Sequence, residues 1–126
     1  MIHLDTHVGV WLYEKDAKRF PPGVLELIEA EELAVSPMAI LELQYLFEIE
    51  GIGVRARTIV DHLRDRIGLI EDSAPYSRVV ERALEIAWTR DPFDRIIVAQ
   101  ASCQKVRLLT KDLTIRRHFP AAVWDD

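Results

Sequence analysis

Glu42 and Asp94 are acidic residues at positions where a helix would be expected to carry apolar side chains. The helical neighbours of Glu42 at three, four and seven positions are Met38, Ala39, Tyr45, Leu46 and Ile49, all apolar or aromatic. Residues 97, 98 and 101, which lie at the same spacings after Asp94, are apolar too. We therefore expect both carboxylates to face the packed side of their helices, where a charge without a partner is costly.

Asp5 and Asp112 are placed differently, because each follows a short apolar run that we expect to be a strand. Asp5 comes directly after the run 1–4, and Asp112 lies just past the run 106–109. Active sites of parallel sheets lie outside the carboxyl ends of the strands, so we expect these two acids on one rim of a sheet. The helices that carry the other two acids begin near strand ends, which brings all four carboxylates toward the same rim.

A cluster of this kind suits a hard divalent cation. Mg²⁺ and Mn²⁺ prefer oxygen ligands and are commonly held by one or two carboxylates together with the phosphate of a substrate. Such a metal activates water and neutralises the charge that develops when a phosphodiester is cleaved. The predicted catalytic and metal-binding residues are Asp5, Glu42, Asp94 and Asp112.

Helix capping is the competing interpretation for three of these acids, because Asp is a preferred residue at the start of a helix. Asp5 and Asp112 each stand directly before an expected helix. Asp91 precedes a proline and is placed to cap the helix that carries Asp94. Asp94 would then be the third residue of that helix, where an acid interacts favourably with the positive helix end. Capping does not explain Glu42, which stands more than one turn inside its helix.

The composition describes one domain with enough apolar residues for a core. The chain has 126 residues, 49% of them hydrophobic, which fits a single domain of roughly 100–200 residues and argues against disorder. Sixteen basic and 21 acidic residues give a net charge of −5. This charge excludes binding of nucleic acid by bulk positive charge, but not a nuclease that meets a polyanion through bound metal. A single cysteine and the lack of a signal-peptide or membrane-span pattern indicate a cytoplasmic protein without a disulfide.

Short apolar runs alternate with helical patterns along the whole chain. Strands are expected at 1–4, 33–35, 69–70, 106–109 and 121–124, and helices at 37–49, 54–67, 75–88, 92–103 and 113–117, with two more before residue 33. Ser36-Pro37 and Asp91-Pro92 each pair a capping residue with a proline at the first helical position. Strands separated by helices indicate an α/β fold, with one domain over 1–126 and a mostly parallel sheet covered by helices on both faces.

Four segments together resemble the PIN-domain nucleases, in particular the small bacterial toxins of the VapC type. They are LDTHVGVWLY with Asp5 and Thr6, SPMAILELQYLFE with Glu42, DPFDRIIVAQA with Asp94, and LLTKD with Thr110 and Asp112. No single segment is specific, but all four stand in the order of the family, and the resemblance extends over essentially the full length.

The resemblance implies an Mg²⁺- or Mn²⁺-dependent endoribonuclease that cleaves RNA, with the four acids as its catalytic and metal-binding residues. Thr6, Thr110 and Asp91 then have auxiliary roles beside these acids. The resemblance also implies a cognate antitoxin protein as inhibitor and a homodimer, for which we expect the aromatic-rich first and third helices to supply the contact faces. No membrane association is implied.

Four basic residues surround the third and fourth of these segments: Arg90, Arg95, Lys111 and Arg116. They are candidates for RNA binding through phosphate contacts, which position a nucleic acid without reading its sequence. The alternative is solvated charge that balances nearby acids. Trp11, Trp88 and Phe93 are candidates for stacking on bases, although their spacing fits packing in a core or interface better.

Two other functions fit parts of the sequence. A phospho-accepting receiver domain has a similar length and an acidic Mg²⁺ site, but it needs an Asp at the end of a central strand near the middle of the chain. Here the middle carries Asp61 and Asp65 on a helical pattern. A catalytically silent interaction module would keep the fold and only bind a partner, and the presence of all four acids speaks against it.

Overall fold

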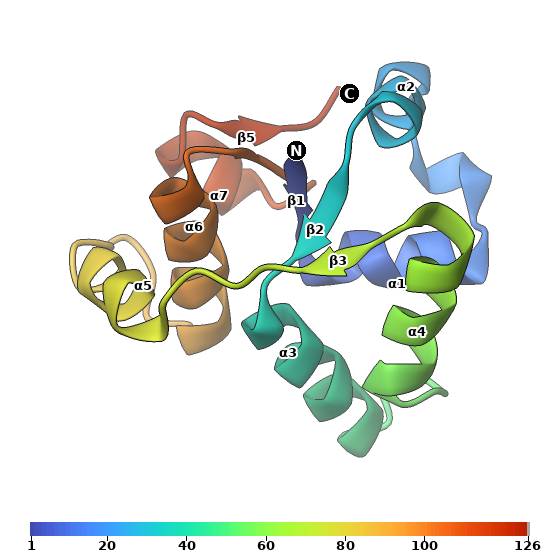
Figure 1. The fold of residues 1–126 in the computed structure, drawn as a ribbon, viewed down its shortest axis with the longest axis horizontal. Helices are drawn as coiled ribbons and strands as arrows, with labels where there is room; N and C mark the ends of the chain where they lie inside the picture. Colours follow the sequence, from blue (N-terminus) through green and yellow to red (C-terminus); the bar gives the residue numbers. More distant parts are fainter. Residues whose placement is uncertain (126) are drawn as a thin grey trace.

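Five parallel strands form one sheet in the order β3-β2-β1-β4-β5, as the computed structural model of the chain shows for residues 1–125 (Figure 1). The strands are β1 (Ile2–Leu4), β2 (Leu33–Val35), β3 (Ile70–Glu71), β4 (Arg107–Leu109) and β5 (Ala122–Val123). The central strand β1 pairs His3 with Ala34 on one side and with Leu108 on the other. The predicted α/β class and parallel sheet are confirmed. The strand order differs from the 2-1-3-4-5 order of receiver-like folds, which argues against that alternative.

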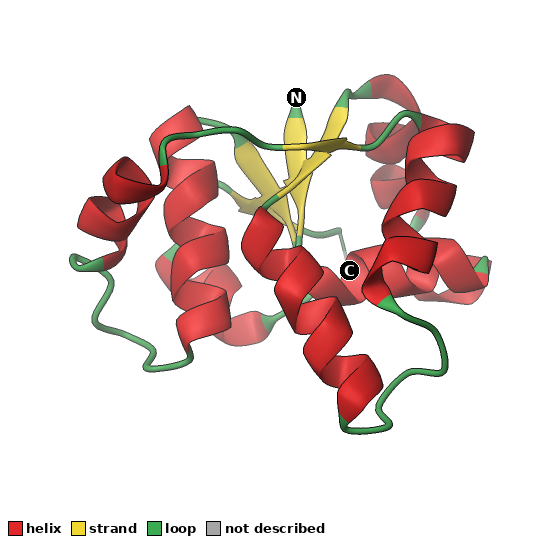
Figure 2. Ribbon diagram, turned by 60° about the horizontal axis from the view of Figure 1, so that its bottom comes forward, coloured by secondary structure: helices red, strands yellow, loops and turns green. Residues whose placement is uncertain are grey.

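The helices lie on both faces of this sheet. They are α1 (Thr6–Glu14), α2 (Pro22–Ala30), α3 (Pro37–Glu48), α4 (Ala56–Ile67), α5 (Tyr76–Ala83), α6 (Pro92–Gln104) and α7 (Leu113–His118). Parallel crossovers are right-handed, so the connections from β1 to β3 and those from β3 to β5 place their helices on opposite faces. Figure 2 shows the two groups on either side of the strands, with α3 between them. Helix α3 contacts both α4 and α6.

The predicted helix starts at Ser36 and Asp91 are confirmed by capping hydrogen bonds. Ser36 Oγ accepts from the Met38 amide at 3.1 Å, and Asp91 Oδ1 accepts from the Phe93 amide at 2.9 Å. These caps begin the two helices that carry Glu42 and Asp94. Local sequence therefore sets where the two acid-bearing helices start.

Two predicted helix boundaries and one short turn differ in the structure. Helix α5 ends at Ala83, five residues before the expected end, and α4 begins at Ala56 rather than at residue 54. After the helix ends, the Ala83 carbonyl accepts from the Ile86 amide at 3.1 Å and from Arg95 Nη2 at 3.0 Å. The chain then turns and buries Ile86. A 3-10 turn over Ala17–Arg19 was not expected from the sequence.

The core lies between the sheet and the two helix groups. Its most completely buried large side chains come from the strands and from the inner faces of the helices: Ile2, Leu4, Leu33, Ile59, Ile97, Leu108, Leu109 and Ile115. Within residues 1–125, no helix combines the length and the apolar character needed to cross a bilayer.

The strand order reverses direction at β1, which has β2 on one side and β4 on the other. In doubly wound sheets a crevice opens outside the carboxyl ends of the strands at such a switch point. Asp5 follows β1 at this edge and Thr110 follows β4, and the Asp5 amide bonds to the Leu109 carbonyl at 3.0 Å. The topology therefore places a crevice where the sequence places its acids.

Candidate metal centre

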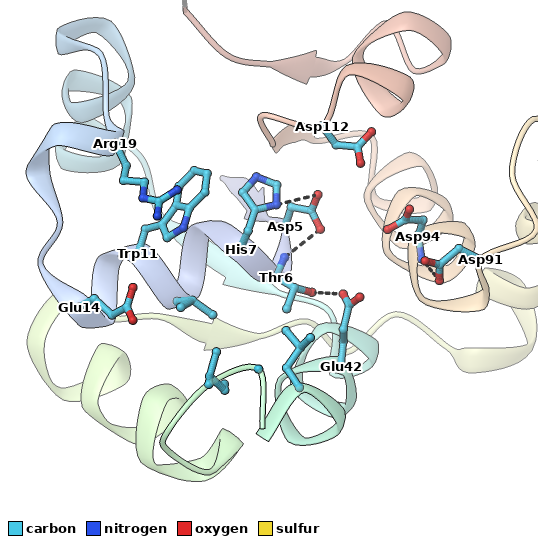
Figure 3. Close-up of a pocket in the computed structure, with 14 residues that line it drawn as sticks. Asp5, Thr6, His7, Trp11, Glu14, Arg19, Glu42, Asp91, Asp94 and Asp112 are labelled. Carbon is cyan, nitrogen blue, oxygen red and sulfur yellow. Dashed lines mark hydrogen bonds and ion pairs between the residues drawn. The ribbon is translucent and has the colours of Figure 1, made fainter. Parts of the chain in front are cut away.

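A cavity of about 520 Å³ lies at the carboxyl ends of β1 and β4, and all four predicted acids line it (Figure 3). We call it the acidic pocket. The residues that line it are Asp5, Thr6, His7, Val10, Trp11, Glu14, Arg19, Glu42, Leu46, Gly51, Ile52, Asp91, Asp94 and Asp112. The predicted convergence of the four acids on one rim is therefore seen in the structure.

Asp5 is fixed by hydrogen bonds to both of its carboxylate oxygens. Oδ1 accepts from the Thr6 amide at 2.8 Å, so Asp5 caps α1, and Oδ2 accepts from the Thr110 hydroxyl at 2.7 Å. The side chain is buried. Capping and membership in the acidic cluster are thus compatible for this residue, because each oxygen keeps lone pairs for a further partner.

Glu42 reaches the pocket from the second turn of α3. Its Oε1 accepts from the Thr6 hydroxyl at 2.5 Å, which holds it beside Asp5. Burial raises the pKa of Glu42, the Thr6 hydrogen bond opposes this rise, and the negative charges of Asp5 and Asp91 add to it.

The environment of Glu42 corrects one expectation from the sequence. Tyr45 and Ile49 were expected to share a packed face with Glu42, but they are 46% and 55% exposed. Glu42 itself is half-buried at the wall of the acidic pocket. Of the apolar residues around it, Ala39 lies in the core and Leu46 lines the cavity. Tyr45 and Ile49 belong to an uncovered helix surface.

Asp94 stands at the third position of α6 and is the most perturbed acid of the pocket. Its pKa is raised from 3.8 to about 7, first by burial and then by the charges of Asp5, Asp91, Glu42 and Asp112. The positive end of a helix favours an ionised carboxylate in the first turn. Here burial and four neighbouring acids outweigh that effect, so the proton is held on Asp94 up to near neutral pH.

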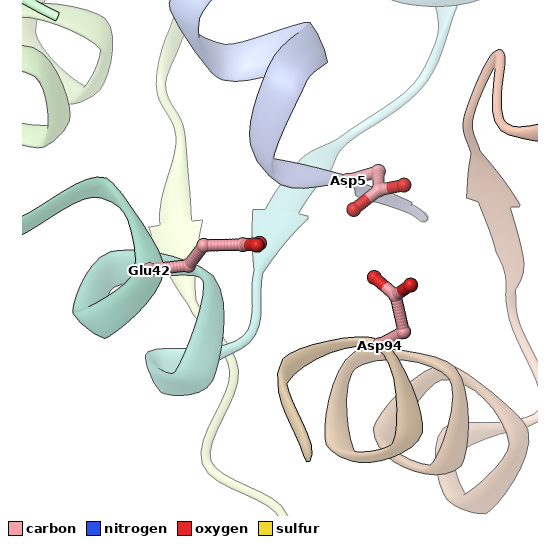
Figure 4. Close-up of side chains that lie close together, drawn as sticks. All are labelled: Asp5, Glu42 and Asp94. Carbon is pink, nitrogen blue, oxygen red and sulfur yellow. The ribbon is translucent and has the colours of Figure 1, made fainter. Parts of the chain in front are cut away.

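Asp5, Glu42 and Asp94 form a compact group within the pocket (Figure 4). Each offers one carboxylate oxygen, and these three oxygens all lie within 4.8 Å of one another. Asp112 lines the same pocket but is not one of this group. Its Oδ1 caps α7 by accepting from the Ile115 amide at 2.9 Å. The structure thus separates three converging acids from a fourth at the rim.

The three residues predicted as auxiliary all contact acids of the pocket. Thr6 donates its hydroxyl to Glu42, and Thr110 donates its hydroxyl to Asp5 while accepting from the Asp112 amide at 3.0 Å. Asp91 caps α6 and lines the pocket. The threonines set the orientation of two carboxylates, and Asp91 adds negative charge beside Asp94.

The four basic residues predicted for RNA binding are not equivalent. Arg95 turns away to bond the Ala83 carbonyl, which ties α6 to α5. Arg90 is exposed on the loop before α6. Lys111 and Arg116 lie together on the far side of Asp112, where they line a second hollow beside the acidic pocket.

His7 and Arg19 belong to the pocket but were not singled out as site residues from the sequence. Lys111 donates its amide to His7 Nε2 at 3.0 Å, and His7 Nδ1 lies 3.6 Å from Asp5 Oδ2. Burial lowers the pKa of His7 more than the nearby acids raise it, so the ring is neutral at neutral pH. The signal available was the position of His7, two residues after Asp5. Nothing local to residue 19 pointed to Arg19.

The group of three acids lacks the Lys or Arg partners that usually compensate carboxylates removed from solvent. Among residues 1–125, no Lys or Arg forms an ion pair with Asp5, Glu42 or Asp94. Like charges crowded together raise one another's pKa, and a bound cation reverses that shift. The arrangement is therefore suited to hold a divalent metal ion, while proton binding by Asp94 relieves part of the repulsion in its absence.

Comparisons with known proteins agree with this geometry. The PIN domain family matches residues 2–118. The chain is 32% identical over 131 residues to Ribonuclease VapC22 of Mycobacterium tuberculosis, a match that covers 96% of each protein.

Solved structures share the fold over nearly the whole chain. VapBC2 from Rickettsia felis, bound to a DNA fragment from its promoter, has a TM-score of 0.67 and 21% identity, and the match covers 99% of this chain and 100% of that one. DNA-bound VapBC from Salmonella typhimurium has a TM-score of 0.65 and 19% identity over 99% and 96% of the two chains. At these identities the likeness concerns the fold. Together with the family match over residues 2–118 and the full-length relative, it shows that the chain belongs to the PIN-domain family.

Proposed function

We propose that this protein is an Mg²⁺- or Mn²⁺-dependent endoribonuclease and the toxin of a toxin–antitoxin pair. The observation that carries the proposal is the group of Asp5, Glu42 and Asp94, with oxygens within 4.8 Å of one another and no Lys or Arg ion pair among residues 1–125. The full-length relative that is named a ribonuclease supports the choice of RNA as substrate.

The donor set fits a hard divalent cation. All three side chains offer carboxylate oxygen, the ligand that Mg²⁺ and Mn²⁺ prefer, and the pocket is large enough to admit a phosphate beside them. We expect Asp5, Glu42 and Asp94 to hold the metal, with Asp112 acting from the rim. A metal bound there supplies an activated water and charge stabilisation for phosphodiester hydrolysis.

The residues of the chain contribute by fixing the acids in place. Asp5 is held at both oxygens by Thr6 and Thr110, and Glu42 is held by the Thr6 hydroxyl. Thr6 therefore couples two of the three acids, since its amide and its hydroxyl bond one each. Such fixed ligands cost no reorganisation when a metal and a substrate arrive, which is how active sites gain from preorganised electrostatics.

The direct test is cleavage of a structured RNA by the purified protein with Mg²⁺, with Mn²⁺ and with EDTA. We expect cleavage that depends on the metal and stops in EDTA. Cleavage that persists undiminished in EDTA would contradict the metal mechanism. A protein that binds metal, shown by a rise in melting temperature, but cleaves no RNA would instead fit the silent interaction module. Labelling by a phosphodonor would fit the receiver alternative.

The antitoxin is the second part of the proposal. The structural neighbours include toxin–antitoxin complexes, one of them from Klebsiella pneumoniae with a TM-score of 0.61 and 16% identity over 98% of this chain and 96% of that one. We propose an inhibitory protein partner of the same kind, acting in the cytoplasm where RNA is accessible. A small reading frame directly upstream would support it. The test is loss of RNA cleavage on co-purification with the product of that frame.

We further propose a homodimer in which the exposed apolar surface of α3 takes part. Leu41 and Tyr45 on α3 are 56% and 46% exposed, and Tyr76 at the start of α5 is 68% exposed. Leu41 and Tyr76 line one apolar hollow between these helices. The aromatic residues of α1 are half-buried against the core, so the exposed apolar residues favour α3 over α1. Sedimentation at tens of micromolar is the test: we expect a dimer, and a monomer after Leu41→Asp.

A further inference from the structure

A second hollow, of about 610 Å³, adjoins the acidic pocket on the side of α7. It is lined by His7, Trp11, Lys111, Asp112, Leu113 and Arg116, and we call it the Trp11 hollow. His7, Trp11 and Asp112 line both cavities, so the two are continuous along one wall. A ligand bound at the acids of the acidic pocket can therefore extend directly into the Trp11 hollow.

The walls of this hollow combine apolar surface with positive charge. Leu113, the first residue of α7, is 67% exposed and contributes nothing to the core. Trp11 supplies the aromatic wall, and Lys111 and Arg116 supply two cationic side chains. The acidic pocket has the opposite character, since five acids besides Asp5 line it. Lys111 and Arg116 thus place two further cationic side chains beside the acidic pocket, whose own lining contains Arg19 as its single Lys or Arg.

The aromatic wall is held rigidly by its neighbours. The His7 ring lies 4.8 Å from the Trp11 ring, and the Lys111 amide bonds His7 Nε2 at 3.0 Å. Phe20 and Trp124 make T-shaped contacts with Trp11, with ring centres at 6.2 and 6.0 Å, and the Arg19 guanidinium lies over the Trp11 ring at 4.8 Å from its centre. Because these contacts fix the indole before any ligand arrives, a flat ligand would lose less entropy by packing against the part of Trp11 that lines the hollow than against a mobile side chain.

We infer that the Trp11 hollow receives one nucleobase of the RNA, next to the phosphate that is cleaved in the acidic pocket. This inference rests on the proposed nuclease function. A base is flat and uncharged, and it stacks on aromatic and apolar surface. Lys111 and Arg116 are placed to contact the phosphate that flanks it. Trp11 and Leu113 are thereby the residues whose apolar surfaces bind the base at this position.

RNA explains the combination of features better than a peptide does. A polyanion that enters an acidic pocket through metal needs positive charge where it leaves the metal, and Lys111 and Arg116 provide it. A base attached to that phosphate needs apolar surface within reach, and Leu113 and Trp11 provide it. Docking of an antitoxin segment in the same hollow is the alternative that the experiment must separate.

The test measures RNA binding by fluorescence anisotropy, in an Asp94→Asn background with Mg²⁺ so that the RNA stays intact. The probes are a labelled RNA of about ten nucleotides, a length within the usual site sizes, and a series in which each base in turn is replaced by an abasic ribose. We expect one abasic position to lower the affinity about 5- to 150-fold, as for the loss of one stacked base.

The same abasic series, measured with variants of the protein, tests whether that base lies in the Trp11 hollow. Leu113→Ala and Trp11→Leu should reduce the abasic penalty at that position to less than about 2-fold, and Trp11→Phe should restore most of it by keeping an aromatic plane. Leu84→Ala is the matched control, because Leu84 is 66% exposed but lies at the end of α5. It should leave the penalty unchanged. Leu113 is exposed, so its variant remains informative if Trp11→Leu fails to fold.

Several outcomes would overturn the inference. An abasic penalty that persists in both Leu113→Ala and Trp11→Leu would place the base elsewhere. No penalty at any position would exclude base recognition. Weaker antitoxin binding by Leu113→Ala with an unchanged RNA penalty would make the hollow a protein-docking surface. In each of these cases, RNA cleavage by the wild-type protein with Mg²⁺ would still support the nuclease function. A wild-type protein that neither cleaves nor binds RNA would refute both the nuclease function and the base-binding role of the Trp11 hollow.

Discussion

Two carboxylates in this protein, the half-buried Asp94 and the buried Asp72, have opposite surroundings. Asp94 lies in the acidic pocket among other acids, and burial and their charges raise its pKa to about 7. Burial alone would raise the pKa of Asp72 as well, but hydrogen bonds from Gln100, the Ala74 amide and Gln104, together with His3, outweigh it and lower that pKa. One acid is short of donors, and the other is surrounded by them.

The network around Asp72 joins three parts of the fold. Gln100 and Gln104 on α6 donate to Asp72 at 2.6 and 2.8 Å, and Ser36 at the start of α3 donates to Gln100 at 2.5 Å. His3 Nε2 on β1 lies 3.3 Å from Asp72. These contacts hold α3 and α6, the helices that carry Glu42 and Asp94, in a fixed relation.

The comparison teaches how to distinguish a structural acid from a functional one. A buried carboxylate with a full set of donors stabilises the fold, because removing it would leave those donors without partners. A group of carboxylates that lie close together without a Lys or Arg partner costs stability, and it suits a ligand that brings positive charge. Burial alone does not separate the two cases, whereas the donor count does. The same contrast yields four predictions.

The largest effect is expected from Asp94→Asn. It removes one of the proposed metal ligands and should lower RNA cleavage by about 10²–10³-fold, the equivalent of several kcal/mol of charge stabilisation. The metal-free protein should keep its melting temperature or gain a few degrees, because one repelling charge is gone. Asp91→Asn is the control in the same helical turn, and it should have little effect since Asn caps helices about as well as Asp. Loss of cleavage only through unfolding, seen by circular dichroism, would mean that the acids are structural.

Asp72→Ala should have the opposite profile. It leaves the amide groups of the buried Gln100 and the exposed Gln104 without their acceptor. We expect a cost of about 2–3 kcal/mol, most of it from Gln100, because a buried donor then loses a charged partner. Denaturant unfolding should report this loss, while metal binding at low temperature should be nearly unchanged. If Asp72→Ala abolished metal binding without loss of stability, the division between structural and functional acids would be wrong.

The pH dependence of stability should distinguish the acidic pocket around Asp94 from the hydrogen-bond network around Asp72. This test needs no mutation of the Asp72 network. The folded pKa of Asp94 is raised from 3.8 to about 7, so the folded state binds this proton more tightly than the unfolded state does. The resulting stability is fully present below about pH 4 and is lost as pH rises through about 7. Metal-free wild type should therefore lose more melting temperature than Asp94→Asn between about pH 5 and 8. Added Mg²⁺ should restore it more at about pH 8 than at pH 6, because metal and proton compete for Asp94. Equal pH profiles for the two proteins would contradict the assignment.

The smallest effect is expected from Asp112→Asn. Asp112 lies at the rim, its Oδ1 caps α7, and its charge is the weakest of the four that raise the pKa of Asp94. Asn preserves the cap, so stability should hold, and cleavage should fall by about 10-fold, as for residues that act on a metal from outside its direct ligands. A loss as large as that of Asp94→Asn would make Asp112 a fourth direct ligand.

Much of the fold and of the site follows from short-range patterns. The caps at Ser36 and Asp91 set where α3 and α6 begin, and the parallel α/β order follows from strands alternating with helices. The strand-end position of Asp5 and the helical positions of Glu42 and Asp94 were enough to predict their convergence. The end of α5 was not predicted, and one of the contacts made there comes from Arg95, which is twelve residues further along the chain.

Sequence alone does not distinguish Asp72 from Asp5, since each follows a strand at its carboxyl end. Only the tertiary structure brings Gln100 and Gln104, 28 and 32 residues away, onto Asp72, and leaves Asp94 facing other acids. The Trp11 hollow likewise exists only where α1 meets the start of α7. Periodicity and capping act within a few residues, so they place a side chain on a face or at an edge. Whether a buried carboxylate meets donors or other acids depends on segments distant in the chain, which packing alone brings together.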